Sequence, residues 1–229
     1  RGNAQNLDLN RDFVKCDSKN ALSFATLINE LDPDFYVETH VSNGADYPYT
    51  ITYLPAQEDK IGLSVGSHMR TEWTPFITKK VSAAGFKIFP YLNVHGTTPD
   101  QGFGAFYDSP RYSTGFLTLR QTPGYITETH MLKPYQKRVE STFEFIHACV
   151  ELLSAQSIRS VVDKSRKAVQ STVDFPLDWA IDSTKATEIA FDGYKSGYKK
   201  SEVTGEPRLF YDRTQPYSAN IPYYPALKP

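Results

Sequence analysis

The stretch Asp32-Pro33-Asp34-Phe35-Tyr36-Val37-Glu38-Thr39-His40 decides the fold class. Before it, apolar residues recur at helical spacing at Leu22, Ala25, Ile28 and Leu31. Ser18 stands where a helix N-cap is expected, and Pro33 disfavours the helical conformation for the residue before it, so this helix should end near Asp32. Phe35–His40 then has the composition of a buried strand. A helix, a turn and a strand in this order are the repeating unit of an α/β sheet.

Similar patterns occur on both sides of this unit. A short strand is expected at Leu7–Phe13, a helix at Pro75–Ala84 that ends at Gly85, and strands at Lys87–Val94 and Tyr125–His130. A longer helix opens at Pro134. Its apolar stripe is formed by Val139, Phe143, Ile146, Val150 and Leu153.

The composition changes after Ser154. Ile158–Val169 has the pattern of one more helix, and Glu202–Pro207 resembles a hairpin turn between two strands. The later residues are rich in Tyr, Pro and Gly. We therefore expect a catalytic-type α/β domain over residues 1–154 and a partly β C-terminal extension over residues 155–229.

Composition excludes several classes of protein. The 25 Lys and Arg against 26 Asp and Glu give a net charge of −1, which provides no electrostatic footprint for nucleic acid. No apolar run approaches the roughly 18 residues of a membrane span. Cys16 and Cys149 form neither a disulfide framework nor a CxxC metal motif. The sequence lacks GxGxxG and GxxxxGK[ST], so the usual dinucleotide and nucleotide-triphosphate signatures are missing. Gly62-Leu63-Ser64-Val65-Gly66 does match the bare pattern GxSxG.

Three groups of residues have the chemistry of a functional site. His40 closes the strand Phe35–Thr39, where a neutral imidazole can bind a metal or simply form a loop hydrogen bond. Glu128 lies in an otherwise apolar or β-branched strand, as either a buried ion pair or a catalytic base. Asn10-Arg11 joins an amide to a guanidinium, which suits a carboxylate clamp or an ordinary surface position.

Their order along the chain resembles that of the zinc metallocarboxypeptidases of the carboxypeptidase A type. The family motif R-x-N followed by D-L-N-R-[ND]-F is matched by Arg1-Gly2-Asn3 and Asp8–Phe13. His40–Tyr47 resembles the segment that carries the third zinc ligand, and Glu128–Tyr135 resembles the segment with the catalytic glutamate. The match covers about residues 1–150. It implies a mixed sheet flanked by helices on both faces.

The resemblance also implies roles for individual residues. His40 is a Zn²⁺ ligand, Glu128 is the general base, and Arg1 stabilises the oxyanion of the scissile carbonyl. Asn10 and Arg11 grip the terminal carboxylate of a peptide substrate. Tyr107 fits the spacing of the family's mobile tyrosine, and Tyr112 is its rival, which we place among the substrate-binding residues.

The sequence departs from the family at the other zinc ligands. The family takes them from an H-x-x-E motif upstream of the matching arginine, and this sequence begins at that arginine, Arg1. His68-Met69-Arg70-Thr71-Glu72 has one residue too many. A catalytic zinc normally has three protein ligands. We therefore expect these residues to be the carboxyl-side part of a peptidase domain, with weak zinc binding and little activity when alone.

Two other functions remain open. Deacylases of N-acyl amino acids, in the aspartoacylase and succinylglutamate desuccinylase group, also have a D-L-N-R-x-F stretch. A non-catalytic relative that binds peptides or glycans is the second alternative. The resemblance favours a secreted or periplasmic location, without deciding it.

Overall fold

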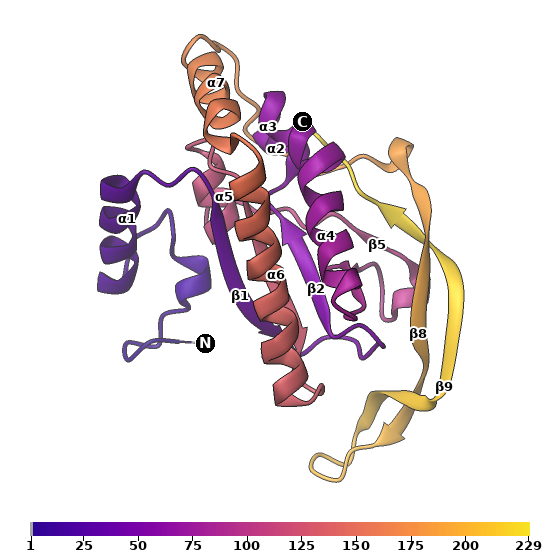
Figure 1. The fold of residues 1–229 in the computed structure, drawn as a ribbon. Helices are drawn as coiled ribbons and strands as arrows, with labels where there is room; N and C mark the ends of the chain where they lie inside the picture. The colour runs from indigo at the N-terminus through magenta and orange to yellow at the C-terminus, as the bar shows by residue number, and fades with distance from the viewer. Residues whose placement is uncertain (1) are drawn as a thin grey trace.

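The computed structural model describes residues 2–229, apart from the side chain of residue 63. Its main sheet has four strands in the order β1-β6-β2-β3 (Figure 1). These strands are β1 (Tyr36–Ser42), β2 (Ile51–Pro55), β3 (Ile88–Pro90) and β6 (Gly124–His130). β1 is parallel to β6, whereas β2 is antiparallel to β6 and parallel to β3. The expected mixed α/β architecture is confirmed.

Helices lie on both faces of the main sheet. α4 (Thr74–Ala83) and α6 (Tyr135–Ala155) cover one face, where Phe145 of α6 contacts Tyr125 of β6 edge to face. Glu38 of β1 is in register with Ile126, the neighbour of Tyr125, so the side chain of Glu38 points to the opposite face. α5 (Ser113–Thr118) lies on that second face, because its Ser113 donates a hydrogen bond to Glu38.

The helix expected before the first strand is also confirmed. α1 spans Lys19–Leu31, and the Ser18 hydroxyl caps it by accepting a hydrogen bond from the amide of Ala21 at 3.1 Å. α4 is followed by Gly85, whose φ of +89° suits a residue without a Cβ. Three short helices connect β2 to α4: α2 (Glu58–Ile61), α3 (Leu63–His68) and a π-helical turn at Met69–Trp73.

Two sequence expectations were wrong. Residues 7–13 do not form a strand; Leu9–Arg11 is a 3₁₀ turn, because the Asp8 carboxylate caps it by accepting a hydrogen bond from the amide of Asn10. The strand expected at 87–94 is split into β3 and β4 (Asn93–Val94), which belong to different sheets. Pro90 lacks an N–H group and cannot continue the ladder, which explains the break.

The C-terminal part forms a second sheet in the order β4-β5-β9-β8. β5 spans Phe103–Gly104, and β8 (Thr187–Lys200) and β9 (Pro207–Tyr224) make the long hairpin at one side of Figure 1. The expected turn is confirmed between these two strands. β7 (Ala180–Ile181) and β10 (Leu227–Lys228) form a separate two-stranded pair. Two further 3₁₀ turns lie at Pro99–Gln101 and Ser183–Lys185.

The residues beyond 154 share hydrophobic cores with those before it. α7 (Ile158–Gln170) contributes Ile158 and Val162 to the cluster that contains Phe145. Phe191 of β8 belongs to a second, largely aromatic cluster with Tyr49. The division of the chain at residue 154 stays a prediction, and residues on both sides of it contribute to the same two hydrophobic clusters.

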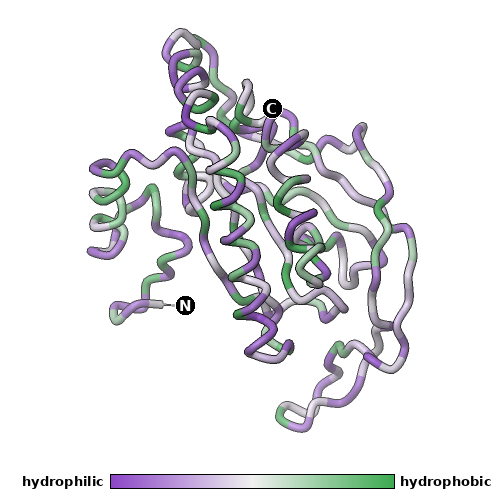
Figure 2. The backbone as a smooth tube through the Cα atoms, in the orientation of Figure 1, coloured by the Kyte–Doolittle hydropathy of each residue, from purple (hydrophilic) through white to green (hydrophobic). Residues whose placement is uncertain are grey.

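The apolar stripe of α6 lies at the surface. Its five members are each at least 40% exposed: Val139, Phe143, Ile146, Val150 and Leu153. Figure 2 shows hydrophobic and hydrophilic residues alternating along this helix. The buried side consists of Ser141, Phe145, Ala148, Cys149 and Leu152. Its small members let α6 approach α4 closely. No helix formed by residues 2–229 combines the length and apolarity that a bilayer crossing requires.

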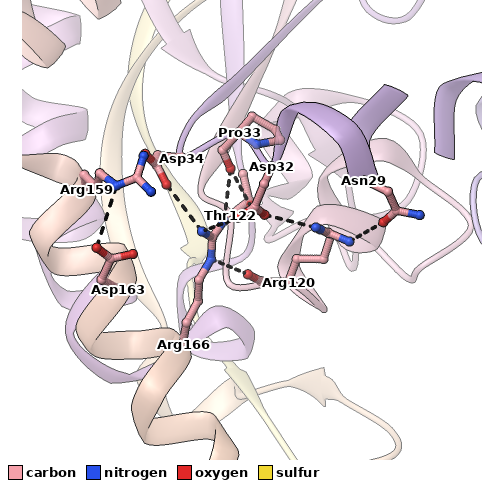
Figure 3. Close-up of polar contacts among 9 residues, drawn as sticks. All are labelled: Asn29, Asp32, Pro33, Asp34, Arg120, Thr122, Arg159, Asp163 and Arg166. Atoms are coloured by element: carbon pink, nitrogen blue, oxygen red, sulfur yellow. Dashed lines mark hydrogen bonds and ion pairs between the residues drawn. The ribbon is translucent and has the colours of Figure 1, made fainter. Parts of the chain in front are cut away.

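Arg166 fastens α7 to the main sheet (Figure 3). Its guanidinium donates hydrogen bonds to the backbone oxygens of Pro33 and Arg120, at 3.1 and 3.2 Å. It also contacts the carboxylates of Asp32 and Asp34, at 3.3 and 3.4 Å. These partners lie in the two turns that lead into β1 and β6, so one side chain holds the amino ends of both strands.

Replacement of Arg166 by Ala should therefore lower the free energy of unfolding by about 1.5–3 kcal/mol, the range for hydrogen bonds to a charged group. Urea denaturation measures this loss. Arg159→Ala is the matched control, because Arg159 also contacts Asp34 but its side chain is 70% exposed, and it should change stability by less than about 1 kcal/mol. Equal losses in the two variants would contradict the role given to Arg166.

Candidate functional site

His40 and Glu128 meet near the carboxyl ends of β1 and β6. The two residues are in direct register, so their side chains project from the same face of the sheet. The Nδ1 atom of His40 lies 3.4 Å from Oε1 of Glu128. The side chains are only 21% and 14% exposed. The structure thus brings together the two residues that the sequence singled out at strand ends.

A second carboxylate holds the other ring nitrogen of His40. Glu38 lies two residues earlier on the same face of β1, and its Oε1 is 2.6 Å from Nε2 of His40. The other oxygen of Glu38 accepts hydrogen bonds from the hydroxyls of Tyr36, at 3.1 Å, and Ser113. His40 therefore lies between two carboxylates. Ser113 donates to Glu38 instead of His40, so the group lacks the serine–histidine bond of a serine hydrolase.

These contacts favour the charged forms of His40 and Glu38 over the neutral forms. The carboxylates of Glu128 and Glu38 raise the pKa of His40 to about 9, against the opposing effect of burial. Burial alone would raise the pKa of Glu38, but hydrogen bonds from His40 and Ser113 outweigh it and leave that pKa below its usual value. Without a metal, His40 is an imidazolium at neutral pH that donates from both nitrogens.

The raised pKa makes stability depend on pH. Protonated His40 stabilises the folded state fully below pH 6.5, and this contribution should be lost as the pH rises through about 9. In metal-free protein the loss should amount to about 3 kcal/mol, at 1.36 kcal/mol per pKa unit. Urea denaturation between pH 6 and about 10 would measure it, with His40→Gln as the control that removes the step. Parallel curves for the two proteins would contradict this account.

Asn10 and Arg11 lie in the 3₁₀ turn at Leu9–Arg11, next to Tyr112. The Arg11 guanidinium stacks over the Tyr112 ring, 4.4 Å from its centroid, and donates a hydrogen bond to the backbone oxygen of Asn10 at 2.7 Å. The side-chain oxygen of Asn10 is buried, with no hydrogen-bond partner among the described residues. Because Tyr112 immediately precedes Ser113, this pair adjoins the group around Glu38 and His40.

The Tyr91 hydroxyl is influenced electrostatically by both groups. Burial raises its pKa first, and the negative charge of Glu128 and the Tyr112 phenol raise it further, whereas Arg11 acts in the opposite direction. All three therefore lie within electrostatic range of the Tyr91 hydroxyl. Tyr91 also lines a cavity of about 100 Å³ with Glu58, among other residues. The half-buried pair Asn10-Arg11, the imidazole of His40 and the carboxylates of Glu38 and Glu128 thus lie around one region of the sheet.

Of the expected catalytic residues, Tyr107 is not brought into this group. Arg1 lies outside the described residues, so its place is not described. Tyr107 is beside Lys60, whose Nζ lies 5.5 Å from the centroid of its ring, and burial raises the pKa of Tyr107 ahead of any neighbouring charge. Of the two candidate tyrosines, Tyr112 is the one in contact with Arg11.

A buried cluster around Asp46 holds the loops that follow β1 and β6. The Asp46 carboxylate contacts Lys133 at 3.1 Å and Arg213 of β9 at 2.6 Å. His130, which is almost fully buried, donates a hydrogen bond from Nε2 to the backbone oxygen of Gly44, 3.1 Å away. The long hairpin therefore restrains the segment directly after Glu128.

The described residues fit one part of a zinc site. His40 has one ring nitrogen held by Glu38 and the other directed at Glu128. Oε2 of Glu128 is buried without a hydrogen-bond partner among the described residues, as expected of an oxygen awaiting a ligand or a water. No group of three or more His, Cys, Asp or Glu within residues 2–229 is arranged to hold a metal ion. The described residues therefore offer one histidine beside a carboxylate, and no complete set of zinc ligands.

The chain matches no protein-family model, no curated protein and no solved structure. The case for a function therefore comes from its own residues.

Sequence reasoning missed several members of the site. Glu38 could have been predicted from the sequence, because side chains two residues apart on a strand project from the same face of the sheet, and Glu38 lies two residues before His40. Ser113 and Tyr91 could not, because only the folding of α5 and the end of β3 brings them to the site.

Proposed function

We propose that this protein is a zinc-dependent carboxypeptidase that hydrolyses the C-terminal peptide bond, with a sheet of the zinc-carboxypeptidase type. The observation that most supports the proposal is the pairing of His40 with Glu128, whose second oxygen is buried and unpartnered. His40 would hold the zinc through Nδ1. When bound, zinc lowers the pKa of a coordinated water toward about 7 and so supplies a nucleophile near neutral pH.

Glu128 is the general base in this proposal. Its unpartnered Oε2 accepts the proton of the attacking water and passes it to the leaving amine. The low exposure of both Glu128 and His40 strengthens the electrostatic interaction between them. Arg1, the residue that matches the family's oxyanion-stabilising arginine, would stabilise the charge that develops on the scissile carbonyl oxygen.

Asn10 and Arg11 bind the terminal carboxylate of the peptide. Stacking on Tyr112 holds the Arg11 guanidinium in place, and its remaining N–H groups can donate to both oxygens of a carboxylate. Tyr107 remains the proposed mobile tyrosine by its spacing, whereas the contact with Arg11 favours Tyr112 for a part in binding.

The proposal requires further zinc ligands. The family's H-x-x-E motif does not occur in the 229 residues, so these ligands must come from outside them. An assay should therefore use the whole gene product, with any further segments that the gene encodes.

The test compares three substrates with zinc-loaded protein. An N-acylated dipeptide with a free carboxylate should be hydrolysed, and the same dipeptide as its C-terminal amide should be hydrolysed far more slowly, because Arg11 loses its partner. Faster hydrolysis of a simple N-acyl amino acid would instead favour the deacylase alternative. No hydrolysis of any of them, with zinc bound, would favour a binding protein and overturn the proposal.

A further inference from the structure

A cavity near the candidate site is lined by aromatic rings and one carboxylate. Its volume is about 100 Å³, and its aromatic members are Tyr53, Tyr91, Phe106 and Tyr223. Apart from the tyrosines, Glu58 is the one acidic or basic residue in the described lining. We propose that this cavity binds the cationic end of a basic side chain, so that the preferred substrates end in Lys or Arg. This inference rests on the proposed carboxypeptidase function.

Aromatic contacts link the cavity to the proposed carboxylate clamp. The ring of Phe106 lies 6.4 Å from that of Tyr91 and 5.0 Å from that of Tyr112, both edge to face. The Arg11 guanidinium stacks over the same Tyr112 ring, 4.4 Å from its centroid. A peptide whose terminal carboxylate is bound by Arg11 therefore has its last side chain on the side of the cavity.

The cavity is also close to Glu128. Its lining includes Leu54 of β2, which is in register with Ile126 of β6, two residues before Glu128. One strand across and two residues along correspond to roughly 8 Å between the Cα atoms of Leu54 and Glu128. The side chain of a C-terminal residue cleaved beside Glu128 can span this separation.

The charges around Glu58 favour a cationic ligand. Oε2 of Glu58 and Oδ1 of Asp59 lie 2.8 and 2.6 Å from nitrogens of the same Arg70 guanidinium. The two carboxylates are largely buried, whereas Arg70 is half exposed, so one hydrated cation serves two negative charges. Burial outweighs Arg70 and raises the pKa of Glu58 above its usual value. A second cation in the cavity would compensate this carboxylate.

The aromatic lining and the size favour a slender basic side chain. Cations are attracted to the faces of aromatic rings. Burial, followed by the negative charge of Glu58, raises the pKa of Tyr223 to about 12, so its hydroxyl is neutral and lies within electrostatic range of the carboxylate. An engineered cavity of about 150 Å³ binds benzene. The smaller cavity here suits an ammonium or guanidinium group and not the ring of Phe or Trp.

The first test measures binding of butylguanidinium to the whole gene product by calorimetry, with butylurea as its neutral analogue. Glu58→Gln should weaken butylguanidinium binding about 10–100-fold, the effect of losing a hydrogen bond to a charged group, and leave butylurea binding unchanged. Glu72→Gln is the matched control, because Glu72 is half exposed and outside the cavity. Ala105→Leu, which fills the cavity, should abolish binding of both compounds and keeps the test decisive if Glu58→Gln fails to fold.

The second test compares N-acylated dipeptides that end in Lys or in norleucine, which has nearly the same shape without the charge. With zinc-loaded protein, kcat/KM should favour Lys about 10–100-fold in the wild type and be nearly equal in Glu58→Gln. No preference for Lys in the wild type, or equal butylguanidinium affinity in a folded Glu58→Gln, would overturn the inference and leave the carboxypeptidase function intact. Hydrolysis of neither dipeptide, with butylguanidinium binding that depends on Glu58, would instead overturn the proposed function and leave a cation-binding cavity.

Discussion

Replacement of Glu128 by Gln should lower kcat for C-terminal hydrolysis by about 10²–10⁴-fold, the usual contribution of a positioned general base. The amide has nearly the same shape but cannot accept the water proton. Because Glu128 is not a zinc ligand in the proposal, zinc content should remain unchanged. Steady-state kinetics on the zinc-loaded gene product, together with metal analysis, measures both quantities.

Glu188→Gln is the matched control for this variant. Glu188 is exposed on β8, in the hairpin, and should tolerate the same chemical change without loss of activity. A Glu128→Gln protein that retains wild-type kcat would exclude Glu128 as the base. A loss of kcat accompanied by loss of zinc would instead identify it as a metal ligand.

Replacement of Asp108 by Ala should destabilise the protein by about 3–5 kcal/mol, as expected when one partner of a buried ion pair is removed. The Asp108 carboxylate is 2.6 Å from Nζ of Lys60, and their side chains are 2% and 10% exposed. Burial raises the pKa of Asp108, so its charge depends on this partner. Without Asp108, the ammonium group of Lys60 would remain buried and uncompensated. Urea denaturation at neutral pH gives the free energy of unfolding.

The double variant Lys60→Met, Asp108→Leu provides the control, since apolar replacement of both partners is often neutral. It should recover most of the stability lost in Asp108→Ala. If the double variant is as unstable as the single one, lost packing rather than an unpaired charge explains the effect.

The alternation of strands and helices could be predicted from local patterns because those patterns follow the covalent chain. Ser18 and Pro33 fixed the limits of α1, and the residues of β1 and β6 were apolar or β-branched on both sides of His40 and Glu128. The meeting of His40 with Glu128 then follows from parallel pairing, which brings the carboxyl ends of the two strands to one edge of the sheet.

Other features depended on interactions that periodicity does not report. The alternation of Leu7 and Leu9 suggested a strand. Instead, the Asp8 carboxylate accepts a hydrogen bond from the amide of Asn10 and caps a 3₁₀ turn at Leu9–Arg11. The stripe from Val139 to Leu153 has helical spacing, yet the side of α6 with small residues is the buried one. The stacking of Arg11 on Tyr112 joins residues about a hundred positions apart, and only the path of two loops creates it.

The most direct test of the zinc hydrolase proposal is the zinc content of the whole gene product and of its His40→Gln variant, by elemental analysis after reconstitution. The account predicts about one zinc per chain in the wild type, a clear loss in the variant, and little zinc in the 229 residues alone. Absence of zinc from the whole product, or an equal content in the variant, would contradict it.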